Sequence, residues 1–187
     1  MLEKLFSTVK SCAKYGIPVV VVHVSETYTP PEISETGLLR FDRLVSFAAE
    51  NGVTVAFENL RVPSYLFTVM ERYKDAKNVG FCWDTGHEAC FTDGREFMPD
   101  FGERLAYTHI HDNLAEPSGD LHRIPFDGVL DYERIATHLR RREWSGDLTF
   151  EVFPDNYELY KGMTAEEFYK RAFDAAEKVR RLIKGEE

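Results

Sequence analysis

Five short apolar runs alternate along the chain with longer segments in which apolar residues recur every three or four positions. The runs span residues 18–24, 53–58, 79–84, 106–111 and 147–153. They are rich in β-branched and aromatic residues and carry apolar side chains on both faces, which is typical of parallel strands buried on both sides. Helical spacing in the segments between them predicts an α/β fold with strands and helices in alternation.

The predicted helices have recognisable ends. Gly16 closes the first helix, and Asn51-Gly52 closes the second. Asp131 is the expected cap of one later helix, and Thr164 to Glu167 form a capping box at the start of the last. Helices are expected over residues 2–15, 38–50, 63–73, 131–142 and 164–184, with loops over 27–37, 91–100 and 113–128.

Length and composition predict one domain over residues 1–187. The 187 residues suffice for a large core, and 43% apolar with 29% charged residues is typical of a globular protein. No apolar run approaches the roughly 18 residues of a membrane span, and the N-terminus does not resemble a signal peptide. Three cysteines without paired spacing indicate thiols in a reducing cytosol. The net charge of −9 argues against a nucleic-acid partner. We therefore expect a cytoplasmic protein.

Each predicted strand ends in a residue with catalytic or metal-binding chemistry. These residues are His23, Glu58, Asp84, His111 and Glu151. Side chains alternate between the two faces of a strand, and each polar end residue shares the less apolar face of its strand. A barrel interior with a site at the carboxyl ends of its strands requires that arrangement.

Converging carboxylates would repel one another unless a cation holds them. Glu58, Asp84, His111 and Glu151 form a mostly oxygen donor set that suits Mn²⁺ or Mg²⁺ and also accepts Co²⁺ or Zn²⁺. The alternative interpretation is that each is an isolated polar residue where a strand meets a loop. His87 follows Asp84 by three residues, although Asp-Thr-Gly is also a good helix entry.

Other polar residues permit plainer interpretations. Asp120 and His122 lie in the long loop, where such a pair ordinarily forms a turn with a solvated histidine. His109 is expected to be a hydrogen-bonded core histidine, and His138 a solvated residue of a charged helix. The cysteines are expected to pack as small apolar groups, and residues 140–142 to form an exposed basic face.

Several motifs in order resemble one family. They are Val55-Ala-Phe-Glu-Asn59, Cys82-Trp-Asp-Thr-Gly-His87, His109-Ile-His-Asp112, His122-Arg-Ile-Pro125 and Phe150-Glu-Val152. This set is similar to the xylose isomerase-like TIM-barrel superfamily of sugar phosphate isomerases and epimerases, which includes endonuclease IV. The resemblance implies divalent-metal ligands at Glu58, Asp84, His111 and Glu151, and substrate-binding histidines at His87, His122 and His23.

The resemblance also implies a partial, N-terminally truncated barrel. A full TIM barrel has eight strands and about 250 residues. The five units predicted here correspond to the fourth to eighth. An open arc of five strands would leave two edges and an inner face exposed. We therefore expect a homodimer whose apolar interface includes the first helix or the first strand.

The expected function is a metal-dependent isomerase or epimerase of a small sugar, sugar phosphate or hydroxy-carbonyl compound. Glu58 or Glu151 would remove a proton beside the carbonyl, and a metal-held enediolate would receive it back. Two alternatives stay open. One is an endonuclease IV-like metal-dependent phosphodiesterase, to which His23, His87, Asp120 and His122 correspond by motif. The other is a barrel that binds metal without catalysis.

Overall fold

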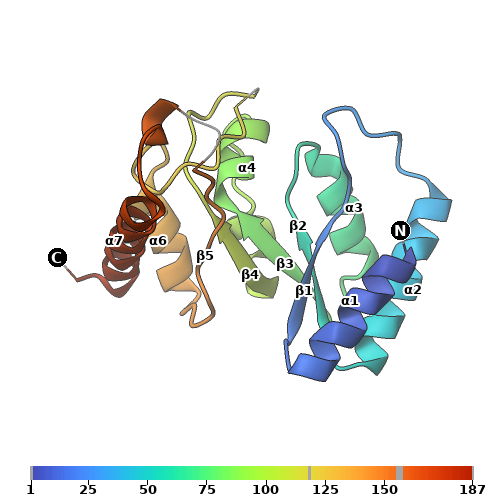
Figure 1. The fold of residues 1–187 in the computed structure, drawn as a ribbon. Helices are drawn as coiled ribbons and strands as arrows, with labels where there is room; N and C mark the ends of the chain where they lie inside the picture. The colour runs from blue at the N-terminus through green and yellow to red at the C-terminus, as the bar shows by residue number, and fades with distance from the viewer. Residues whose placement is uncertain (1, 118, 155–157, 187) are drawn as a thin grey trace. The chain divides into compact units, whose positions relative to one another are not determined.

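The computed structural model describes residues 2–117, 119–154 and 158–186 (Figure 1). The chain divides into two compact units. The first comprises Met1–Trp83 and Arg104–Tyr107, and the second comprises Asp84–Glu103 and Thr108–Glu187. The strands of the chain follow the order β1-β2-β3-β4-β5, so strands that are consecutive in sequence are neighbours in the sheet. The prediction of a single domain over residues 1–187 stays a prediction.

Three parallel strands form the sheet of the first unit. They are β1 (Val19–His23), β2 (Thr54–Glu58) and β3 (Val79–Asp84), whose last residue belongs to the second unit. The register sets His23 opposite Glu58 and Val55 opposite Val79. All six residues of β3 are buried, as expected for a central parallel strand.

Helices α1 (Leu2–Tyr15), α2 (Glu35–Glu50) and α3 (Pro63–Arg72) pack beside these strands (Figure 1). Gly16 follows α1 with a φ of 70°, the left-handed conformation that glycine adopts at low cost. The Ser34 hydroxyl caps α2 by accepting a hydrogen bond from the Gly37 amide at 3.1 Å. The core of this unit includes Leu44, Val55, Phe57 and Leu66, none of which is exposed.

The second unit contains most of the remaining elements. Its helices are α4 (Thr85–Phe91), α5 (Met98–Phe101), α6 (Tyr132–Arg141) and α7 (Ala165–Lys184). Short 3₁₀ turns cover Gly102–Arg104 and Glu158–Tyr160. Strand β4 (Leu105–Ile110), which begins in the first unit, runs parallel to β5 (Thr149–Phe150) with His109 opposite Thr149. Helices α6 and α7 lie side by side (Figure 1).

The structure differs from the predicted elements in three places. Helix α2 begins at Glu35 rather than at residue 38, because Ser34 caps it. Residues 85–91 form a helix that the sequence suggested only as an entry turn. Strand β5 covers two residues instead of seven: the Phe153 amide donates to the His122 carbonyl oxygen, so the chain turns toward the long loop. Among the described residues, no helix combines the length and apolarity needed to cross a bilayer.

Candidate functional site

Asp84 connects the end of β3 to the start of α4. Its Oδ1 atom accepts a hydrogen bond from the His87 amide at 2.7 Å and thereby caps the helix. The same oxygen lies 3.0 Å from Nε2 of His111. Neither the Asp84 nor the His111 side chain is exposed. The capping contact therefore fixes a carboxylate at the strand end, where it meets two imidazoles.

Gly86 allows the His111 ring to lie against the first turn of α4. A Cβ atom at Gly86 would lie 2.0 Å from Cε1 of His111, far closer than any real contact. The Asn113 side chain secures the same turn by donating to the Gly86 carbonyl oxygen at 3.0 Å. Only glycine at this position permits so close an approach of ring and backbone.

The His87 ring lies between two carboxylates. Its Nδ1 is 3.4 Å from Oδ2 of Asp84, and its Nε2 is 3.1 Å from Oδ2 of Asp120. The His87 side chain is 5% exposed. A histidine held at one nitrogen by a carboxylate presents its other nitrogen in a defined direction, as metal-binding histidines commonly do.

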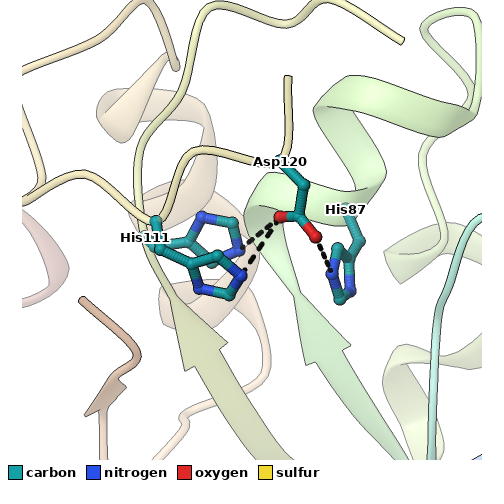
Figure 2. A group of neighbouring side chains, drawn as sticks. His87, His111 and Asp120 are labelled. Atoms are coloured by element: carbon teal, nitrogen blue, oxygen red, sulfur yellow. Dashed lines mark hydrogen bonds and ion pairs between the residues drawn. The ribbon is translucent and has the colours of Figure 1, made fainter. Parts of the chain in front are cut away.

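Three imidazoles converge on Asp120. Figure 2 shows the carboxylate facing the rings of His87 and His111. The distances from its oxygens to Nε2 are 3.1 Å for His87, 3.2 Å for His122 and 3.9 Å for His111. One ligand atom from each of the four residues lies within 4.8 Å of the others, which is compact enough to hold a metal ion. We call His87, His111, Asp120 and His122 the histidine cluster.

The backbone carbonyl of Glu151 orients His122. Nδ1 of His122 lies 2.9 Å from that carbonyl oxygen, which can only accept, so Nδ1 carries the proton. Nε2 is then the nitrogen directed toward Asp120. The His122 ring stacks on the His111 ring with 4.1 Å between centroids and 15° between planes. A histidine whose Nδ1 bonds to the backbone while Nε2 faces the other donors has the usual arrangement of a metal ligand.

The pKa values of Asp120 and His122 favour a charged pair when no cation is bound. Burial alone would raise the pKa of Asp120, but hydrogen bonds from His122 and His87 hold it well below its usual range. Burial alone would lower the pKa of His122, but the Asp120 carboxylate raises it above its usual range. A cation bound here would replace the proton on Nε2 of His122, since metal binding releases protons from its ligands.

A second group of donors in the same unit is richer in oxygen. Asp84, His109 and Glu151 each offer a ligand atom within 4.8 Å of the others. Nδ1 of His109 lies 3.5 Å from Oε2 of Glu151. Half-buried His109 thus faces a carboxylate, which the expected core histidine would not require. We call these three residues the carboxylate group.

Two of the residues predicted from the sequence belong to the first unit. His23 and Glu58 are neighbours in register, and Nε2 of His23 lies 3.1 Å from Oε2 of Glu58. The Glu58 side chain is 1% exposed and that of His23 is 55% exposed. The second unit brings Asp84, His87, His111 and His122 together. The roles predicted for all of these residues, and for Glu151, stay predictions.

Sequence reasoning gave no weight to the position of Asp120 and misjudged His138. The spacing Asp120-Leu-His122 was the available signal, but a turn with a solvated histidine explained it equally well. The solvated histidine predicted at residue 138 is wrong: its side chain is 14% exposed and Nε2 lies 3.0 Å from Oε2 of Glu96. The three cysteines are buried, as predicted.

Comparison with known proteins places the chain in a family. Residues 2–183 match the family described as "Xylose isomerase-like TIM barrel". An uncharacterized protein, y4fM, of Sinorhizobium fredii (strain NBRC 101917 / NGR234) is 30% identical over 196 residues, which cover 97% of this chain and 61% of the relative. The chain thus spans about three fifths of the length of that curated relative.

Solved structures with the same fold include sugar epimerases. A D-tagatose 3-epimerase-like protein superposes with a TM-score of 0.73 at 19% identity, covering 98% of this chain and 68% of that one. D-psicose 3-epimerase with D-tagatose, from Clostridium cellulolyticum H10, gives 0.74 at 14%, covering 97% and 70%. A Thermus thermophilus protein, TTHB071, soaked with ZnCl₂, gives 0.69 at 19%, covering 100% and 69%. The chain therefore belongs to the xylose isomerase-like TIM-barrel family, and its five parallel strands form part of such a barrel.

Proposed function

We propose that this chain carries the site of a metal-dependent sugar isomerase or epimerase. The observation that supports this most directly is the carboxylate group, in which Asp84, His109 and Glu151 offer donors within 4.8 Å of one another. These residues lie at or near the carboxyl ends of parallel strands, where barrels of this kind have their active sites. Family membership supports the same reaction class.

The donors fit a divalent cation. Two carboxylates and one imidazole suit Mn²⁺, Co²⁺ or Mg²⁺, and they also accept Zn²⁺. We assign the histidine ligand to His109 rather than to His111, since His109 shares a donor group with Glu151 whereas His111 shares one with Asp120. Glu58 is proposed as the fourth ligand, as predicted from its motif.

The proton chemistry is proposed for the two glutamates. Oε2 of Glu151 accepts the proton from the carbon beside the substrate carbonyl, and Glu58 returns a proton to the same carbon on the other face. A bound divalent cation supplies positive charge beside the carbonyl oxygen, which makes that carbon more acidic. His87, His122 and His23 donate hydrogen bonds to substrate hydroxyls. A return to the same carbon inverts its configuration, which is epimerisation.

A small ketose is the proposed substrate. The structural relatives include a D-allulose 3-epimerase from Methylomonas sp. in complex with D-allulose and an L-ribulose 3-epimerase. The proposed mechanism requires a carbonyl next to a carbon that carries both hydrogen and hydroxyl, and a ketose supplies both.

Deuterium exchange tests this function. The purified protein, loaded with Mn²⁺ or Co²⁺, is incubated in D₂O with D-allulose, D-tagatose and L-ribulose, and proton NMR follows loss of the signal beside the carbonyl. We expect exchange with at least one sugar and a loss of at least about 100-fold in Glu151→Gln, because an amide cannot accept the proton. Glu166→Gln changes an exposed glutamate of α7 in the same way and should exchange normally.

A matched pair of variants tests the ligand assignment. His109→Asn should reduce the bound catalytic metal after gel filtration, measured by mass spectrometry of the metal, whereas His111→Asn should retain it. The reverse result would restore His111 as the ligand. Metal-loaded protein that exchanges no proton from any of the sugars would contradict the epimerase proposal.

The histidine cluster favours one second candidate, a metal-dependent phosphodiesterase resembling endonuclease IV. Three imidazoles and one carboxylate form a nitrogen-rich set that suits Zn²⁺. Additional bound cations would serve phosphate-ester hydrolysis by stabilising the attacking and leaving oxygens. The net charge of −9 disfavours a nucleic-acid substrate.

The same preparation distinguishes the two candidates. Zinc-loaded protein is mixed with a duplex oligonucleotide that contains one abasic site, and gel electrophoresis detects strand cleavage. Cleavage that Asp120→Asn abolishes, without sugar exchange, would favour the phosphodiesterase. Sugar exchange without cleavage would favour the epimerase.

A further inference from the structure

Asp120 and His122 reach the histidine cluster from a loop without regular secondary structure. The loop follows β4 and covers residues 113–130. Among its described residues, three that are not glycine have positive φ: Ala115 at 55°, His122 at 45° and Phe126 at 75°. Such conformations cost energy and persist only where surrounding contacts impose them. His122 itself is one of the strained residues, so something must hold the loop in place.

The Asp112 carboxylate is the principal contact that does so. Its side chain is completely buried, directly after His111. Oδ1 accepts hydrogen bonds from the amides of Asn113 at 2.8 Å and Leu130 at 3.1 Å, and Oδ2 accepts one from the Phe126 amide at 2.9 Å. One carboxylate thus binds the first residue of the loop, its last residue and the strained Phe126.

The backbone of Asp112 fixes the middle of the loop as well. Its amide donates to the Arg123 carbonyl oxygen at 2.8 Å, and its own carbonyl oxygen accepts from the Arg123 amide at 2.8 Å. Arg123 follows His122 directly. Gly128 also presses on this residue, because a Cβ there would lie 2.2 Å from Oδ1 of Asp112. Asp112 is therefore the point where four parts of the loop meet the end of β4.

We propose that Asp112 is a positioning residue that sets the His122 ring and the Asp120 carboxylate against His111. It acts through the loop and touches neither substrate nor cation. The inference rests on the proposed function only in taking the histidine cluster as part of the working site. The loop geometry itself is independent of that function.

Asp112→Asn tests the inference in the metal-free protein first. The variant keeps the side-chain volume but replaces one acceptor oxygen by an NH₂ group that would face backbone N–H donors. Histidine-selective ¹⁵N NMR reports the protonation of each ring nitrogen. We expect His122 in the wild type to be protonated at Nδ1, and in the variant to lose the signals of a single bound ring.

Zinc binding provides the second measurement. Calorimetric titration with ZnCl₂ should show affinity lower by about 10- to 100-fold in Asp112→Asn, as for residues that orient metal ligands. Asp127→Asn is the matched control: it lies in the same loop, but its carboxylate pairs with Arg171 and accepts from the Tyr160 hydroxyl at 2.9 Å. The control should retain the His122 signals and the zinc affinity.

Gly128→Ala keeps the test decisive if Asp112→Asn does not fold. It leaves the carboxylate in place but displaces it, and it should produce the same His122 change. Wild-type His122 signals and zinc affinity within about twofold in a folded variant would overturn the inference. If the wild type binds no zinc, the proposed function loses support while the NMR comparison still decides the role of Asp112.

Discussion

Gly86 is the residue at which one added methyl group disturbs the site most directly. We predict that Gly86→Ala displaces the His111 ring, because the new Cβ would lie 2.0 Å from Cε1 and 2.4 Å from Nδ1. Zinc affinity, measured by calorimetry, should fall by at least about 10-fold. The free energy of unfolding should fall by about 1–3 kcal/mol, the usual cost of overpacking.

Gly37→Ala is the control for this substitution. Gly37 is also helical, but an added Cβ there meets only the Ser34 hydroxyl oxygen, at 3.3 Å. Zinc affinity should remain at the wild-type value. An unchanged affinity in Gly86→Ala itself would show that the His111 ring does not need its observed position.

A carboxylate far from the site gives a prediction about pH. Asp42 accepts hydrogen bonds from Nε of Arg72 at 2.8 Å and Nη2 of Arg72 at 2.6 Å, and from the Tyr73 hydroxyl at 2.7 Å. The hydrogen bonds from Arg72 hold the pKa of Asp42 below its usual range. A carboxyl group with a depressed pKa stabilises the fold above its unfolded value of about 3.9 and loses that contribution as pH falls.

Asp42→Asn should therefore destabilise the protein at neutral pH and less at acidic pH. We expect a loss of about 1 kcal/mol at pH 7, given that the pair is partly exposed, and a smaller loss below pH of about 3. Urea unfolding of variant and wild type at both pH values measures it. An equal loss at both would mean that the charge of Asp42 does not contribute.

At the scale of elements, hydrophobic periodicity and capping signals predicted most of the fold. The capping box of Thr164 and Glu167 and the Asp131 cap are present as the sequence indicated. Strand β5 was predicted too long, because its continuation is decided by bonds to a distant loop. Asp120 could not be assigned for the same reason: its partners lie 33 residues away at His87 and on β4, and only the folded loop brings them together.

The Asp131 cap yields a prediction about α6. Its side chain accepts a hydrogen bond from the Arg134 amide at 3.0 Å. Nη1 of Arg134 in turn pairs with Glu88 of α4 at 3.1 Å. Asp131→Ala should lower the free energy of unfolding by about 1 kcal/mol, the usual cost of losing a cap, whereas Asp131→Ser should retain most of it. Chemical denaturation compares the two, and equal stabilities would exclude the cap as the cause.

The molecule as a whole carries apolar surface in two regions. Tyr169 and Phe173 are 70% and 65% exposed, one turn apart on α7. In the first unit, residues of α1, β1, α2 and α3 line a cavity of about 690 Å³ that includes Leu5, Val21 and Phe41. Strand β1 is at the end of the strand order, so within the described residues one of its edges has no neighbouring strand. Unpaired edges and apolar surface favour association.

We predict a homodimer in solution, with its interface at the first helix or the first strand. A two-fold dimer is the commonest assembly of soluble proteins, and burial of apolar surface contributes about 25 cal/mol per Å². Light scattering at micromolar concentration should give twice the mass of one chain. Leu5→Glu introduces a charge into the cavity region and should yield monomers, whereas Tyr169→Glu on α7 should leave the dimer intact. The opposite pattern would move the interface to α7, and a wild-type monomer that unfolds cooperatively would show that no second copy is needed.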